Sequence, residues 1–172
     1  MENPNLGQTP RVVSPFSHAM RWGMLLGLCF IVNFLMSVSG IAVLSFFTWV
    51  LDIFILYLVY RIAKNYRDKE CEGQIRYGQV FSYILLLFFF AALIAGAVKY
   101  IYLQFIAPDY LNTLYNQTML LLESLGTNLP ENFDVQLQQL LQPIQYTFQS
   151  ITSDCFLGCF VGVIYGFFIR RN

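Results

Sequence analysis

Charged residues are scarce in this chain, and several long stretches contain almost none. Asp, Glu, Lys and Arg make up only 12% of its 172 residues, whereas 57% are hydrophobic. Water-soluble domains carry about a quarter charged residues, so the chain lacks the polar surface that such a domain needs. The formal net charge is zero, which indicates neither nucleic acid nor an acidic ligand as a partner. These shortages point to a protein whose partner is the lipid bilayer.

The usual sequence signatures of enzymes and metal sites are also missing. There is no HExxH, P-loop, GxSxG or dinucleotide-binding pattern. The only histidine, His18, precedes the first apolar run beside no evident acid or nucleophile. The four cysteines show no CxxC or Cys/His ligand spacing, and we interpret them as small apolar groups rather than as a disulfide framework: Cys29, Cys71, Cys155 and Cys159. We therefore predict a protein that is not an enzyme and has no cofactor and no metal site.

Long apolar runs are what the chain has instead. Segments of about 20 apolar residues are long enough to cross a bilayer, and four runs approach or exceed this length: 22–38, 41–62, 80–106 and 151–169. The first is too long for the apolar core of a cleaved signal peptide, so we expect a retained span. We predict a disordered cytoplasmic tail over residues 1–15, a single membrane domain over residues 16–172 and a charged, solvated connector over residues 63–79.

The segment between the third and fourth runs, residues 107–150, differs in kind. Pro108 and Asp109 are suited to the first turn of a helix, and leucines then recur at three- and four-residue steps until Gly126, a typical C-cap residue. Residues 128–130 favour a turn, a second amphipathic stripe follows, and Pro143 is expected to kink or restart it. The predicted fold is an all-α integral membrane four-helix bundle, with an extracytoplasmic helical hairpin between spans 3 and 4.

The distribution of basic residues predicts the orientation of these spans. Cytoplasmic segments of membrane proteins collect Lys and Arg. The turn near Ser39 and Gly40 and the 107–150 loop contain none, although the loop has four acidic residues. All basic residues except Lys99 lie in or beside the tail, the connector and the C-terminus: Arg11, Arg21, Arg61, Lys64, Arg67, Lys69, Arg76, Arg170 and Arg171. This pattern predicts that both termini are cytoplasmic and that the long loop lies outside.

Three charged residues fall within the apolar runs, namely Asp52, Lys99 and Asp154. A charge at membrane depth costs roughly 3 kcal/mol on insertion scales. A helical rise of about 1.5 Å per residue places Lys99 roughly 10 Å and Asp154 roughly 5 Å below the outer ends of their spans, a difference that the long lysine side chain can bridge. We therefore propose a Lys99–Asp154 pair. It is interpreted as a fixed ion pair between two helices; the alternatives are a Lys99 that extends to the outer surface, or a working ion or substrate site.

Asp52 is predicted to lie deeper, near the middle of the bilayer, with no basic residue at an evidently equal depth. It can be a protonated acid, face Lys99, or bind Ser, Tyr or Asn33 on a neighbouring span. A single mid-membrane acid is also the first residue to test for proton-coupled transport, whereas a neutral, hydrogen-bonded acid is the structural alternative.

Small residues mark one face of the last span. Asp154 is followed at four-residue steps by Gly158, Gly162 and Gly166, which share one face of a helix. Such a face lets a second helix approach closely. Two glycines of the first span are predicted to lie level with Gly162 and Gly166, namely Gly23 and Gly27. We predict that the first and last spans cross closely within one molecule; a homodimer through the glycine face is the alternative.

Three local segments resemble a family of small four-span bacterial inner-membrane proteins of unknown function. They are the small-residue start of the first span (22–27), the connector from Tyr60-Arg61 through 73–81, and the Ile106-Ala107-Pro108-Asp109-Tyr110 sequence that opens the long loop. The resemblance covers nearly the whole chain after the tail. It implies a location in the bacterial cytoplasmic membrane and brings no established activity or functional residues.

Two functions remain open at this point. The first is a structural or interaction protein of the cell envelope, whose loop or glycine face engages a second copy or another envelope protein. The alternative is a small proton- or ion-coupled transporter, as a homodimer if more spans are needed, that uses Asp52, Lys99 and Asp154. Few spans and the lack of an evident inverted repeat weigh against transport.

Overall fold

The computed structural model describes residues 15–71, 73–126 and 132–170, and these residues are almost entirely helical. Four helices are long and apolar enough to cross a membrane: α1 (Pro15–Val38), α2 (Ala42–Glu70), α3 (Tyr77–Ile101) with its continuation η1 (Tyr102–Ile106), and α6 (Pro143–Ile169). This confirms the predicted all-α bundle of four apolar helices. Most of the predicted tail, the turn at residues 128–130 and Arg171 lie outside the described residues.

Five helix ends differ from the predicted spans 22–38, 41–62, 80–106 and 151–169, namely the starts of α1, α2, α3 and α6 and the end of α2. Helix α1 begins at Pro15, before the predicted start of the first span at residue 22, and so takes in the last residue of the expected tail. The connector, predicted as a solvated segment over residues 63–79, is helical as far as Glu70, because Ala, Lys, Arg and Glu are strong helix formers even where they are charged. The last span begins at Pro143, which occupies the first turn of α6 and so starts that helix rather than kinking it.

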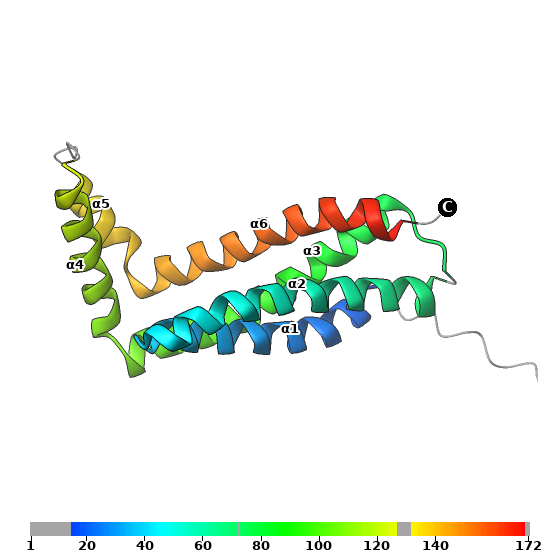
Figure 1. Cartoon of the computed structure of the whole chain (residues 1–172), viewed down its shortest axis with the longest axis horizontal. Coiled ribbons are helices and arrows are strands. Elements are labelled where there is room, and N and C mark those ends of the chain that lie inside the picture. The colour runs from blue at the N-terminus through cyan, green and yellow to red at the C-terminus, as the bar shows by residue number, and fades with distance from the viewer. Residues whose placement is uncertain (1–14, 72, 127–131, 171–172) are drawn as a thin grey trace, which may run out of the picture.

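Helix α3 is the centre of the bundle. Its side chains Ile84, Leu87, Phe88 and Ala91 are fully shielded from solvent. Helices α1 and α6 pack along opposite sides of α3, and α2 packs chiefly against α1 (Figure 1). Apolar residues that are buried on several sides form the common core of the bundle. The high apolar content of the third run thus reflects a helix surrounded by protein over much of its length.

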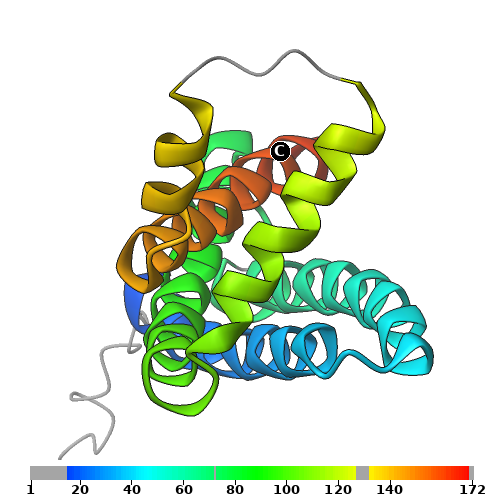
Figure 2. The same ribbon diagram turned by 90° about the vertical axis from the view of Figure 1, so that its left-hand side faces the viewer.

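Helix α2 is joined to the bundle mainly by its second half. Among the α2 side chains that the structure describes, the buried ones run from Ile55 to Tyr66. In this half the Tyr165 hydroxyl of α6 donates to the Leu56 carbonyl at 3.1 Å, and Arg67 Nη1 donates to the Ile169 carbonyl at 3.2 Å. The start of α2 lies away from α6 when the molecule is viewed from the hairpin end (Figure 2), and Phe46, Trp49 and other large apolar side chains there are exposed.

The turns between helices use glycine where the backbone requires it. Gly40, between α1 and α2, has a φ of 68°, and Gly126, which follows the C-cap residue Leu125 of α4 (Asp109–Ser124), has a φ of 62°. Positive φ values of this size suit glycine because it lacks a Cβ atom. At the end of α3 the helix widens into the π-helical turn η1. This turn ends at Ile106, and Ala107 is its C-cap residue before Pro108.

Two short helices form an arm at one end of the bundle. Helices α4 and α5 (Phe133–Leu140) run across the ends of the long helices rather than along them, and their tips extend beyond α6 (Figure 1). The Tyr115 hydroxyl on α4 donates a hydrogen bond to Asp134 Oδ1 on α5. At the base of the arm, Phe34, Leu103 and Leu111 form a small second core. The helical hairpin is thus present, attached to the bundle at its base.

Candidate functional site

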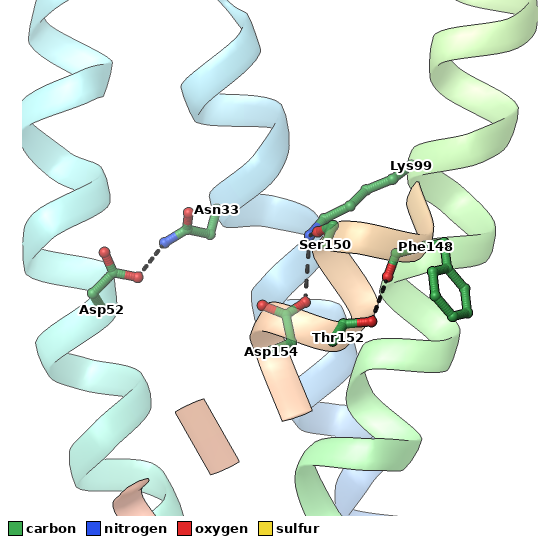
Figure 3. A network of polar contacts seen from close by, with 7 residues as sticks. All are labelled: Asn33, Asp52, Lys99, Phe148, Ser150, Thr152 and Asp154. Carbon is green, nitrogen blue, oxygen red and sulfur yellow. Dashed lines mark hydrogen bonds and ion pairs between the residues drawn. The ribbon is translucent and has the colours of Figure 1, made fainter. Parts of the chain in front are cut away.

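The charged side chains of the spans lie at the level where α1, α2, α3 and α6 approach the hairpin end. Lys99 of α3 donates from Nζ to Ser150 Oγ of α6 at 2.5 Å, and the same nitrogen lies 3.4 Å from Asp154 Oδ2 (Figure 3). Ser150 and Asp154 are four residues apart and therefore share one face of α6, so one lysine reaches both. The structure brings these two of the three intramembrane charges together.

The surroundings of this ion pair are largely apolar. The side chains of Lys99 and Asp154 are 12% and 22% exposed, and Lys99 Nζ lies 5.8 Å from the centre of the Phe34 ring. An ammonium group over an aromatic face is favourable, and the attraction between charges strengthens where water is excluded. Lys99 thus contacts a carboxylate and a hydroxyl of α6 and an aromatic ring of α1. These contacts join both helices to α3.

The third charged residue, Asp52, is arranged differently. Asn33 Nδ2 of α1 donates to Asp52 Oδ1 of α2 at 2.7 Å, and the Asp52 side chain is exposed (Figure 3). Of the partners open on sequence grounds, the structure therefore selects Asn33 and not Lys99. The exposure follows from the position of Asp52 in the half of α2 that leads away from the bundle. The Asp52 carboxylate therefore has a neutral hydrogen-bond partner, the Asn33 amide, and is otherwise exposed.

The glycine faces of α1 and α6 are both filled by α3. A methyl group added to Gly158 would lie 2.6 Å from Phe88 Cβ, and one added to Gly23 would lie 2.8 Å from Phe90 Cβ. The remaining three glycines meet α3 in the same way: Gly27 at Ala91, Gly162 at Phe81 and Gly166 at Tyr77. The predicted crossing of the first and last spans is therefore wrong, because bulky α3 side chains lie between them. The glycines of α1 pack against one side of α3, and the glycines of α6 pack against another side.

An aromatic cluster at the opposite end of the bundle was not expected from the sequence. His18 Nδ1 lies 2.7 Å from the Tyr83 hydroxyl, and the Tyr66 ring stacks on Tyr83 with 4.1 Å between centroids and 2° between planes. Trp22 packs against His18 on its own helix. These residues come from α1, α2 and α3 and are separated by dozens of positions, so no local spacing could have indicated them. The sequence around His18 shows no evident acid or nucleophile, and the structure gives it the Tyr83 hydroxyl as a partner.

The polar contacts at these sites are an ion pair and hydrogen bonds. Within residues 15–71, 73–126 and 132–170, no three His, Cys, Asp or Glu side chains lie close enough together to hold a metal ion. All four cysteines are free thiols, and burial raises the pKa of the Cys71 thiol, which lies outside the spans. A thiol with a raised pKa is a weak nucleophile at neutral pH.

Comparison with known proteins assigns the chain to a family. The family model described as a protein of unknown function, DUF4199, matches residues 21–171, which covers most of α1 and all of the later helices. Neither the comparison with curated proteins nor that with solved structures gives a match. With four helices of membrane-spanning length, the chain is a multi-pass membrane protein, and it belongs to the DUF4199 family of proteins of unknown function.

Proposed function

We propose that this chain is a non-enzymatic interaction protein of the bacterial cytoplasmic membrane, with both termini in the cytoplasm and the α4–α5 hairpin outside. The orientation is supported by the absence of Lys and Arg from residues 107–150 and by their concentration near the opposite ends of the spans. A reporter inserted after Gly126 tests it. Activity typical of the extracytoplasmic side is expected, and cytoplasmic behaviour would contradict the orientation.

The observation that carries the interaction role is the hairpin arm itself. The glycine faces of α1 and α6 are occupied by α3, so they are not available to a partner. The arm, in contrast, projects beyond α6 and exposes Leu121, Leu125 and Val135. Between its helices lies a hollow of about 660 Å³, whose wall combines amide side chains such as Asn116 and Gln138 with leucines and prolines. Apolar contact area beside hydrogen-bonding groups is the composition of protein interfaces.

Site-specific photocrosslinking in intact membranes tests this role. A photoreactive residue at Asn116, which lines the hollow, is expected to give a discrete crosslinked species. The matched control is a photoreactive residue at Phe160, which is exposed on α6 and is expected to give lipid adducts only. The mass of the species distinguishes a second copy of the chain from another envelope protein. Equal products at both positions would argue against the role.

A small proton- or ion-coupled carrier is the second candidate. It is favoured by one observation: Lys99 and Asp154 form a pair inside the bundle, and the Asp52 carboxylate on α2 is exposed. The purified chain in vesicles with a pH-sensitive dye inside provides the test. A carrier predicts proton flux that is lost in Asp52→Asn and kept in Asp109→Asn, a matched change outside the spans. Absence of flux in the unmodified chain would remove this candidate.

A further inference from the structure

A hollow of about 550 Å³ lies between the start of α1 and the end of α2, at the end of the bundle opposite the hairpin. Its wall includes Arg21 and Lys69, together with His18, Trp22 and Asn65. Among the residues that the structure describes, neither Arg21 nor Lys69 has an acidic partner within ion-pairing distance. Two exposed cations from different helices therefore face a shared space, and the single acidic residue of its wall, Glu70, forms no direct ion pair with either of them in the described part of the chain.

The groups around this hollow are mainly hydrogen-bond donors. Guanidinium, ammonium and indole groups donate and do not accept. His18 already binds the Tyr83 hydroxyl through Nδ1, so Nε2 is the nitrogen left to meet a ligand. When the tyrosine donates to Nδ1, the neutral ring carries its hydrogen on Nε2 and becomes another donor. Glu70 is the one acidic residue in the wall. Such a set suits a ligand that is rich in acceptor oxygens and negatively charged.

The hollow also has an apolar side. Leu25 lies one helical turn further into the membrane-spanning part of α1 than Arg21, and it completes the wall beside Trp22. The hollow thus has cationic groups towards the water and apolar groups towards the lipid. A phospholipid has the same order, since its phosphate lies at the water side of its acyl chains. An inorganic anion would use only the first of these two layers.

We propose that this hollow binds the phosphate group of an anionic phospholipid. Arg21 and Lys69 hold the phosphate oxygens, His18 and Asn65 contribute hydrogen bonds, and Trp22 and Leu25 contact the glycerol and acyl region. The tyrosine stack behind His18 holds the imidazole in place. The proposal requires only that the spans cross a bilayer, and it is independent of both proposed functions.

A neighbouring hollow provides a matched comparison. It has a volume of about 330 Å³ and is lined by Arg61, Lys64, Asp68 and other residues, all of them from α2. It also has two cations and one acidic residue, but no second helix faces it. The double variant Arg61→Gln/Lys64→Gln removes the same charge as Arg21→Gln/Lys69→Gln. Comparing the two therefore distinguishes binding at a specific site from general attraction of a basic surface to anionic lipid.

Fluorescence of Trp22 can measure binding directly. The chain has two tryptophans, and Trp49 is exposed on the far half of α2, so Trp49→Phe leaves Trp22 as the only reporter. The detergent-purified full chain is titrated with short-chain phosphatidylglycerol, with phosphatidylcholine and with inorganic phosphate. We expect phosphatidylglycerol to bind more tightly than the other two. The Arg21/Lys69 double variant should weaken binding about 30-fold, which corresponds to about 2 kcal/mol at about 1 kcal/mol per basic side chain, and the Arg61/Lys64 variant less than about threefold.

Glu70→Gln is the second variant and has the opposite expected sign. Removing the one acidic group of the wall should tighten phosphatidylglycerol binding severalfold, a gain that loss of folding cannot produce. Equal weakening by both double variants, or no change with Glu70→Gln, would overturn the proposal. Binding of inorganic phosphate as tight as that of phosphatidylglycerol would assign the hollow to a soluble anion and overturn the lipid assignment.

Discussion

The two carboxylates inside the spans differ in how the protein accommodates them. Asp154 lies in the α1–α3–α6 layer, where it is mostly buried and faces a lysine. Asp52 lies on the part of α2 that leads away from this layer, where it is exposed and has an amide as its partner. The difference shows that the same residue type serves two structural purposes. One carboxylate belongs to a junction between packed helices, and the other belongs to a loosely covered surface.

Breaking the ion pair is expected to have the largest effect on stability. Lys99→Met leaves Asp154 buried without its cation, and removing one partner of a buried pair costs about 3 kcal/mol or more. Unfolding of the purified protein in detergent, followed by circular dichroism, measures this loss. Lys99→Met combined with Asp154→Leu removes both charges and should recover much of the stability. A single variant as stable as the unmodified chain would show that the pair does not join the helices.

Filling the glycine face should have the next largest effect. Gly158→Ala places a methyl group against Phe88 in the packed layer, and overpacking a core costs about 1–3 kcal/mol. Gly78→Ala is the matched control, because Gly78 lies in the first turn of α3 with open space around it. The same unfolding measurement should show no loss for the control. Equal loss at both positions would contradict tight packing at Gly158.

Asp52→Asn should change stability by less than about 1 kcal/mol, because its hydrogen bond to Asn33 is exposed and one amide can still donate to the other. The comparison with Lys99→Met, made in the same detergent, sharpens the contrast between the two carboxylates. A loss as large as that of Lys99→Met would indicate that α2 packs as tightly here as α6 does.

The smallest effect is expected in the hairpin, at the contact between α4 and α5. The hydrogen bond to Asp134 raises the pKa of the Tyr115 hydroxyl. Because the folded pKa is above the unfolded value, the contribution of this contact is fully present below about pH 10, the ordinary pKa of tyrosine, and is lost as the pH rises through the raised pKa. Tyrosinate absorbance is followed as the pH is raised through the alkaline range. The difference between the unmodified chain and Tyr115→Phe measures the titration of Tyr115. A Tyr115 that ionises at the ordinary value would contradict the contact.

The sequence predicts those features that depend on position along a single helix. Four apolar runs indicate four helices, and a fixed rise per residue places Lys99 and Asp154 at similar depth, where the structure pairs them. Features that depend on which helices pack together are harder to predict from the sequence. The glycine rows of α1 and α6 indicate close packing but do not identify α3 as the partner, since any helix with suitable side chains fits such a row. His18 and Tyr83 are 65 residues apart, and neither residue type nor spacing indicates their contact.

The hairpin also changes the area that the protein occupies on the two sides of the bilayer. Helices α4 and α5 lie across the ends of the spans and extend past α6, and α2 diverges from α6 at the same end (Figure 2). The other end, where α2 contacts α6 through Tyr165 and Arg67, is narrower. The molecule is therefore a wedge with unequal footprints. The two ends of the molecule thus differ in cross-section, and the broader end is the one that carries the α4–α5 arm.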